Sequence, residues 1–439
     1  MNRARGIGLA ACGAALLALT GLALALQHPD DIDIDPFLAV ILLQGAVYLA
    51  AVCLVWRAGS SRQIVLGIAA IAVLMRIPIV LAPPALSTDV YRYVWDGRVM
   101  AAGINPYRYA PADPQLAALR DPDIFPNINR ADTAVTIYPP LAEAIFLAVT
   151  RVSESATAMK AAMVGFEIIT FVLLVDLLTR ECLPTGRVAV YAWHPLPLWE
   201  FAGNGHIDAA LIALVVVALW AARRGRRGLT GLFLAGATLT KLYPAVLLPA
   251  VYRRWNWTMP TVFAAVIVVA YLPFIGVGWR VLGFLPGYAG EEGFDAGGSG
   301  FYLLALLRQL PPLAELSGRA YAIAAAAILI ALGAAIIFIG DAPRKPFIAA
   351  ALLGTTLIVL VSPHYPWYFA WLIVFACFIR SIALLWLTIA CMLLYLVPVG
   401  FHIVRDDYRL AIESLIYGPF AALALLDLWY HRRRTTRSS

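Results

Sequence analysis

Apolar segments long enough to cross a lipid bilayer recur along almost the whole chain, and they limit its fold more than any other feature. Hydrophobic residues make up 62% of the 439 residues and charged residues only 13%, whereas soluble domains carry roughly 25% charged residues. A transmembrane helix needs about 20 apolar residues, and backbone inside a bilayer must satisfy its hydrogen bonds internally. The five cysteines show no CxxC spacing. The sequence therefore predicts an all-α polytopic membrane protein and excludes a soluble enzyme, a disordered chain and a disulfide scaffold.

Several of the apolar segments are short, and these come in pairs interrupted by Pro, Gly or His. Such breaks are typical of helices that meet over a cavity, where the freed backbone groups can be satisfied. We expect a bundle of about 12–14 transmembrane helices, some short or broken, with a long outer loop at 83–156 that bears surface helices. The apolar run that ends at Leu26 resembles a signal peptide but lacks a clear small-x-small cleavage site, so we interpret it as the first transmembrane helix.

The basic residues are distributed unevenly between the connections, and this distribution predicts the orientation. The short connections assigned to one side hold 19 of the 33 basic residues, with Glu181 and Asp341 as their only acids. Cytoplasmic connections carry an excess of Lys and Arg. We expect a multi-pass protein of the cell (inner) membrane with cytoplasmic N- and C-termini and with its polar segments at the outer face. The net charge of +7 is then mainly a topology signal, and no nucleic-acid partner is expected.

The long loop opens with the run STDVYRYVWDGR at 87–98, which contains the strongest candidate for a catalytic group. A carboxylate just beyond a transmembrane helix can act as a general base toward a sugar hydroxyl, and Asp89 has this position. In a helix, Asp89, Arg92 and Asp96 would share one face. Two alternatives stay open: Asp89 could merely cap the helix, and Asp96 could be a structural partner of Arg92 or Arg98.

Four further candidates lie at breaks between apolar segments. Lys241 is one of three lysines and separates two apolar half-segments. A charge there costs about 2.5–3.5 kcal/mol, which favours a functional site, although the side chain could instead reach the interface by snorkelling. His206 and Asp208 follow two glycines that could open a helix break, and they could also be structural. His364 lies in the run SPHYPWY at 362–368, where two prolines predict a non-helical turn.

Two more candidates lie close to these breaks. Tyr368 and its aromatic neighbours are either residues of the membrane interface or a platform for a sugar or lipid. Arg405 precedes two aspartates in a charged outer connection, which is either solvated or contacts an anion.

Taken in order, these runs resemble the signatures of a known superfamily. The run STDVYRYVWDGRVMAAGINPY, with Tyr-Pro-Pro at 138–140, is similar to the first outer loop of the GT-C membrane glycosyltransferases. The runs from Trp-His-Pro to GNGHID at 193–208, TKLYP at 240–244 and SPHYPWY match later signatures. The similarity covers roughly residues 65–400 and is greatest to bacterial polyprenyl-phosphate-mannose-dependent mannosyltransferases.

The resemblance implies a reaction and a set of partners. A hexose, most simply mannose, would pass from a polyprenyl-phosphate sugar donor to a glycan or glycolipid acceptor with inversion, and Asp89 would be the general base. Fixed cations and polar groups would bind the donor phosphate or the sugar. The candidates for that role are Lys241, His364, Arg405, His206, Asp208, Arg92 and Tyr368.

The run around Asp89 departs from part of the superfamily in one respect. Some GT-C enzymes carry two adjacent acids here and bind a divalent metal, whereas Thr88 and Val90 flank Asp89 in this chain. One carboxylate is a poor cage for Mg²⁺ or Mn²⁺, which require several oxygen ligands. We therefore expect no metal cofactor, although a divalent metal stays an alternative.

The resemblance also suggests how the chain is divided. We expect an N-terminal transmembrane hairpin at 1–62, a GT-C-like catalytic membrane domain at 63–400, and a last outer loop, final helix and basic cytoplasmic tail at 401–439. Two other classes of function stay open. A transporter or lipid-linked sugar flippase would show internal repeats and charges deep in its spans, and an assembly subunit would keep the scaffold without activity.

Overall fold

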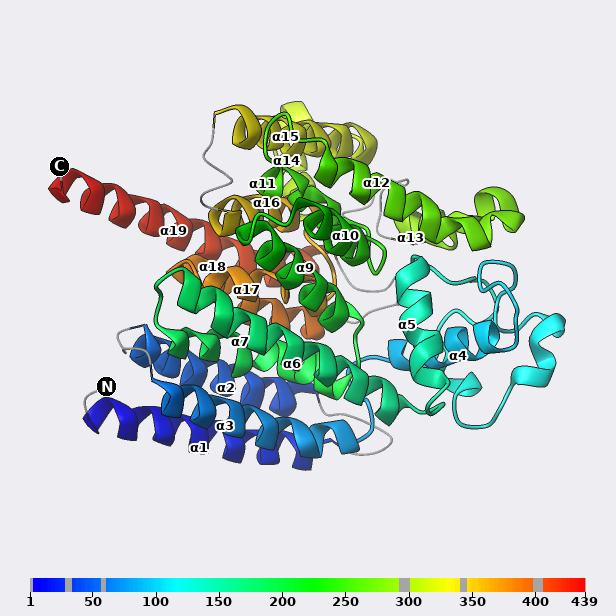
Figure 1. The fold of residues 1–439 in the computed structure, drawn as a ribbon, viewed down its shortest axis with the longest axis horizontal. Coiled ribbons are helices and arrows are strands. Elements are labelled where there is room, and N and C mark those ends of the chain that lie inside the picture. The colour runs from blue at the N-terminus through cyan, green and yellow to red at the C-terminus, as the bar shows by residue number, and fades with distance from the viewer. Residues whose placement is uncertain are drawn as a thin grey trace.

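The chain folds into helices packed side by side (Figure 1). The computed structural model describes residues 3–27, 34–56, 61–291, 301–339, 346–397 and 406–438, and these residues contain no β-strand. Within these ranges, seven helical segments are long and apolar enough to cross a membrane. They are α1 (Arg3–Ala25), α2 (Ile34–Val55), α3 (Arg62–Leu81), α6 (Ala156–Arg180), α12 (Thr258–Tyr271) with its continuation, α15 (Gly318–Phe338) and α19 (Asp406–Ser438).

Shorter and broken helices complete the bundle, as the interrupted apolar segments predict. The short apolar ones are α5 (Pro140–Thr150), α16 (Pro346–Val361), η8 (Pro366–Phe369) with α17 (Leu372–Ala376), and α18 (Ile382–Ala390) with η9 (Cys391–Leu396). Further helices include α4 (Asp89–Ala101), α7 (Ala189–Ala192), α8 (Pro195–Pro197), the π-helix η4 (Leu198–Gly203), α9 (Asp208–Arg223), α10 (Arg227–Thr238), η5 (Tyr243–Leu247) and α11 (Leu248–Val251). The prediction of an all-α polytopic membrane fold is confirmed.

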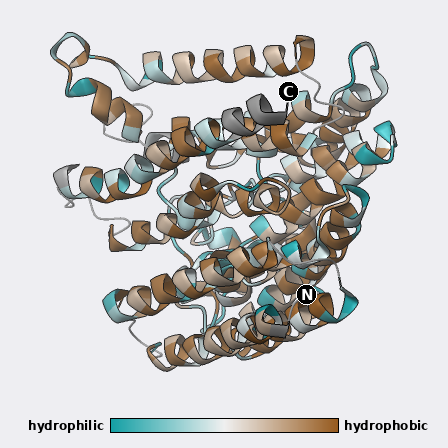
Figure 2. Cartoon of the chain, turned by 90° about the vertical axis from the view of Figure 1, so that its left-hand side faces the viewer, coloured by the Kyte–Doolittle hydropathy of each residue, from teal (hydrophilic) through white to brown (hydrophobic). Residues whose placement is uncertain are grey.

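The bundle has two distinct ends. In Figure 1 the N-terminal end of α1 and the C-terminal end of α19 lie at the left, whereas α4 and α5 of the long loop project at the right. Apolar residues follow the helices, and the most hydrophilic residues gather mainly at helix ends and in connections (Figure 2). This distribution is the one that a bilayer requires, because lipid tails cannot hydrogen-bond polar groups.

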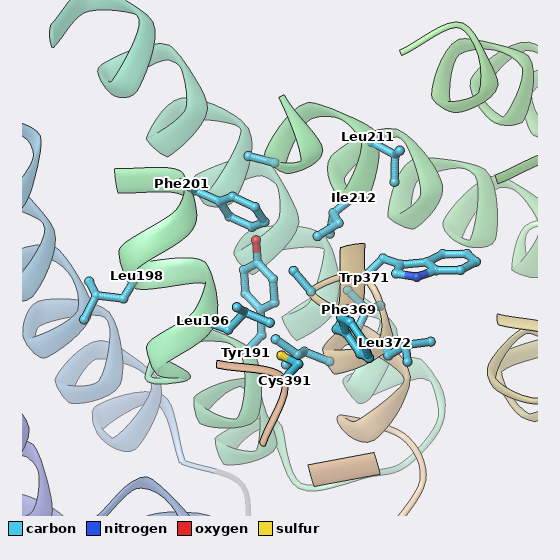
Figure 3. Close-up of a cluster of buried hydrophobic side chains, with 14 of the residues drawn as sticks. Tyr191, Leu196, Leu198, Phe201, Leu211, Ile212, Phe369, Trp371, Leu372 and Cys391 are labelled. Atoms are coloured by element: carbon cyan, nitrogen blue, oxygen red, sulfur yellow. The ribbon is translucent and has the colours of Figure 1, made fainter. Parts of the chain in front are cut away.

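A compact apolar core joins two stretches that are far apart in the sequence. Side chains of the broken stretch 189–212 meet those of 369–391 (Figure 3), and the labelled residues are almost fully buried. They include Tyr191, Leu196, Phe201, Ile212, Phe369, Trp371, Leu372 and Cys391. The core thus fixes the broken stretch, whose far end supplies two of the candidate site residues.

Buried charges hold α3 and α6 together. Arg76 of α3 forms a bidentate ion pair with Glu167 of α6, with its shortest N–O distance at 2.6 Å, and it also donates to the carbonyl of Ala192 at 3.0 Å. Lys160 of α6 donates to the carbonyls of Ile79 and Ala82, at 2.9 and 2.5 Å. These carbonyls lie at the end of α3, where the last carbonyls of a helix lack their regular intrahelical partners, and the Ile79 carbonyl also accepts from the Ala82 N–H at 3.2 Å. The end of α3, from which the chain leads to Asp89, is therefore fixed.

We predict that Arg76→Leu strongly destabilises the protein. The substitution leaves the Glu167 carboxylate buried without its cation, a change that typically costs about 3–5 kcal/mol. Unfolding in detergent, followed by thermal or denaturant titration, measures the loss. Arg180→Ala is the matched control, because its pair with Asp176 is exposed and such pairs contribute about 0–1 kcal/mol. Equal stability of the two variants would contradict the prediction.

The long loop contains the surface helices that the sequence predicts. The apolar stretch at 140–150 forms α5, which packs closely against α4. A Cβ on Gly97 would lie 2.6 Å from the carbonyl oxygen of Phe146, so only glycine allows this approach. Tyr93 stacks on the Phe146 ring at 4.5 Å. The two helices therefore form one rigid unit that begins at Asp89.

Candidate functional site

Asp89 lies where the long loop meets the bundle, and its carboxylate is available for chemistry. The residue is the first of α4, Thr88 is the N-cap residue, and the Thr88 side chain makes no capping hydrogen bond. The Asp89 backbone N–H donates to Ser87 Oγ at 3.2 Å, while Asp89 Oδ1 accepts from Asn129 Nδ2 at 2.9 Å. The side chain is 23% exposed. The alternative that Asp89 merely caps α4 is therefore wrong.

The surroundings of Asp89 raise its pKa above the ordinary value of 3.8. Burial is the largest cause, because it disfavours the charged carboxylate. The Lys241 ammonium, the Asn129 hydrogen bond and the Arg130 guanidinium oppose this effect, and the Asp208 carboxylate adds to it. A carboxylate with a raised pKa is a stronger base, provided that it is deprotonated at the working pH.

Lys241 and Asp208 form a nearly buried ion pair close to Asp89. Lys241 follows the end of α10, and its Nζ lies 2.6 Å from Oδ2 of Asp208, the first residue of α9. Tyr243 donates to Asp208 Oδ1 at 3.0 Å. The ammonium also lies over the Tyr368 ring, 4.5 Å from its centroid, an arrangement that favours a cation. Lys241 is 11% exposed, so it is held at the site and does not snorkel away from it.

His206 lies behind Asp89 and is completely buried. Its Nδ1 is 3.8 Å from Asp89 Oδ2, and its Nε2 is 3.4 Å from Glu200 Oε2. Its ring stacks on Trp367 with centroids 3.9 Å apart. Tyr395 donates to Glu200 Oε1 at 2.5 Å. The imidazole thus lies between two carboxyl groups and an indole face.

A glycine turn fixes this arrangement. Gly205 has φ +73°, a conformation that favours glycine, and a Cβ there would lie 2.9 Å from Val90 Cγ2. Asn204 Oδ1 accepts from the backbone N–H groups of Ala85 and Leu86, at 3.2 and 2.9 Å. The π-helix η4 ends just before this turn, and π-helical turns are frequent at functional sites. The turn therefore ties the broken stretch to the segment that leads into Asp89.

The remaining candidates, His364, Arg92 and Arg405, do not join the cluster around Asp89 in the same way. His364 contacts Arg409 of α19, and Arg409 Nε donates to Glu413 at 3.1 Å. Arg92 lies away from the cluster, because it pairs with Asp96 at 2.8 Å and donates to the carbonyl of Ala134. Asp96 is thus the structural partner that the helical spacing suggests. Arg405 lies outside the described residues.

Sequence reasoning did not single out Asn129, Glu200, Tyr395 and Arg409. A signal was present for Glu200, because an acid inside an apolar stretch is expensive and suggests a site. Asn129 stands in a polar loop and Tyr395 in an apolar run, where many similar residues would qualify. Among the described residues, no group of three or more His, Cys, Asp or Glu side chains could hold a metal ion.

The fold and this cluster define a class of protein: a polytopic membrane protein with a partly exposed carboxylate close to a cation. Residues 7–258 match the family model of the alpha-(1->6)-mannopyranosyltransferase N-terminal domain. That match covers more than half of the chain, so the protein belongs to this family and is a membrane mannosyltransferase. No curated protein and no solved structure matches the chain. The matched range contains Asp89, His206, Asp208 and Lys241.

Proposed function

We propose that this mannosyltransferase uses a polyprenyl-phosphate mannose donor and transfers the sugar to a hydroxyl of a glycan or glycolipid, with inversion. The observation that carries the proposal is the partly exposed Asp89 carboxylate close to the Lys241 ammonium. Asp89 removes the proton of the acceptor hydroxyl, and its oxygen attacks the anomeric carbon. A β-linked donor then gives an α-linked product, and the family's description suggests an α-(1→6) linkage.

Fixed positive charge next to the base supports a phosphate leaving group. Negative charge develops on that phosphate in the transition state, and preorganised cations stabilise it. Among the candidates, Lys241 is the cation whose charge acts on Asp89, and His364 with Arg409 supplies further donors beside the aromatic residues. We include Tyr368 as a platform for the sugar or lipid, because it already covers the Lys241 ammonium.

We further propose that the reaction needs no divalent metal and takes place at the outer face of the cell membrane. A single carboxylate is a poor cage for Mg²⁺ or Mn²⁺. The site adjoins the long loop, at the end of the bundle opposite both chain ends (Figure 1). The excess of basic residues in the connections on the side of the termini favours placing that side in the cytoplasm.

The proposal is tested with purified protein in detergent or proteoliposomes. Mannosyl-labelled polyprenyl phosphate and GDP-mannose are compared as donors, each with and without EDTA, on lipid extracts as acceptors. We expect transfer from the polyprenyl-phosphate donor, unchanged by EDTA, and an α-linkage in the product by NMR. Transfer from GDP-mannose alone would overturn the donor assignment, and loss with EDTA would overturn the metal assignment.

The raised pKa of Asp89 predicts where activity falls with acidity. The base form is lost as pH decreases through the pKa, so a raised pKa moves the acid limb of kcat/KM to higher pH than for an ordinary carboxylate. A pH profile of transfer measures the limb. Asn129→Ala removes a hydrogen bond that favours the charged form and should move the limb higher still. A limb at or below pH 3.8 would contradict the prediction.

A further inference from the structure

His206 was a candidate for sugar binding, but its burial points to another role. The side chain has no exposed surface, and Trp367 covers one ring face. Both ring nitrogens lie near carboxyl oxygens, so neither is directed to solvent. The ring is nevertheless next to the reacting carboxylate, which suggests that it acts on Asp89 and not on the sugar.

The protonation states of His206, Glu200 and Asp89 determine which hydrogen bonds His206 can form. A neutral imidazole carries one N–H, so one ring nitrogen donates and the other accepts. Glu200 is fully buried, and among the described residues its polar contacts are Tyr395, His206 and Asn204, with no Lys or Arg. A buried carboxyl without a cation favours its protonated form. Burial, and in addition the nearby Lys241 ammonium, disfavour a positive charge on the ring, so the imidazole is neutral.

From this geometry we propose that His206 is a positioning residue for the base: protonated Glu200 donates to Nε2 and thereby directs the Nδ1–H toward Asp89 Oδ2. Asn129 holds the other oxygen of the same carboxylate, so both oxygens have a defined donor. The Nδ1–Oδ2 distance of 3.8 Å shortens when the acceptor is bound, as is common for catalytic hydrogen bonds that are long in free enzymes. This inference rests on the proposed role of Asp89 as base.

The backbone supports the same assignment. The His206 backbone N–H donates to the Glu200 carbonyl at 3.0 Å, so the backbone holds these two residues close together. Tyr395 holds Glu200 from η9, and Trp367 holds the ring from η8. The titratable groups that face Asp89 and His206 from the surrounding elements are Lys241, Asp208, Arg130, Glu200, Tyr93, Tyr138 and Tyr395.

The test replaces His206 by side chains whose amide group occupies the position of only one of the two ring nitrogens. His206→Asn places an amide N–H near the position of Nδ1, whereas His206→Gln reaches the position of Nε2. We expect His206→Ala to lower kcat about 10²-fold, because a misplaced catalytic group costs this much, with little change in KM for the donor. His206→Asn should recover part of kcat, and His206→Gln should not. Glu200→Gln should retain more of kcat than Glu200→Leu, since its amide can donate to Nε2, whereas Glu200→Leu should resemble His206→Ala.

A pH profile separates positioning from a structural role. Loss of a donor to the charged carboxylate raises the pKa of Asp89, so the acid limb should move to higher pH in His206→Ala but not in His206→Asn. An unmoved limb in His206→Ala, or equal kcat for the Asn and Gln variants, overturns the inference. If the wild type is active and Asp89→Asn is not, such a result leaves the proposed function standing. If Asp89→Asn keeps full activity, the base assignment itself fails.

Discussion

Asp89→Asn is expected to lower mannosyl transfer by about 10²–10⁴-fold, the usual contribution of a general base. Asparagine keeps the shape of the side chain and can still bond Asn129 after an amide flip, but it cannot accept a proton. Single-turnover transfer from the polyprenyl-phosphate donor measures the chemical step, and donor binding should be almost unchanged. The loss is therefore expected in kcat.

Asp132→Asn is the matched control for this substitution. Asp132 lies in the same long loop and is exposed, and the change removes the same charge. Transfer should stay close to wild type. If both variants lose activity equally, the effect comes from the charge of the loop and not from a base.

Lys241→Met is expected to lower transfer by about 10²–10³-fold, as the loss of one donor to a developing anion does elsewhere. Methionine keeps the length of the side chain and its contact with the Tyr368 ring but removes the ammonium. Lys241→Arg keeps the charge and should retain part of the activity. Steady-state transfer with donors of defined chain length measures these changes.

A double variant separates the two roles of Lys241. The single substitution also leaves the Asp208 carboxylate buried without its cation, which could disturb folding. Asp208→Asn combined with Lys241→Met removes both charges and should restore stability but not transfer. Recovery of transfer in the double variant would show that Lys241 serves only Asp208, and it would contradict the phosphate role.

The fold class could be predicted from the sequence because few backbone structures can satisfy their hydrogen bonds inside a bilayer. Length and apolarity alone identify α1, α2, α3, α6, α15 and α19. The same rules do not specify how the short helices pack. The π-helical turn before Gly205 depends on contacts with Val90 and with the segment before Asp89, which are more than a hundred residues away.

The candidate site could be predicted from the sequence where a charged residue interrupts an apolar segment. Lys241 and Asp208 are charges in apolar sequence, and the structure pairs them. Arg92 was an equally strong candidate from the sequence, but it forms an ion pair with Asp96 of the same helix. Arg409 and Asn129 reach the site from distant elements, so only the packing of α19 and of the long loop reveals them.

The Asn204 bonds to Ala85 and Leu86 have a consequence for how this enzyme can diversify. They join the start of the long loop, just before Asp89, to the broken stretch of the bundle. Substitutions at exposed loop positions such as Arg108 and Gln115 should then leave Asp89 in place, whereas Tyr107 and Leu116 are buried and constrain the loop.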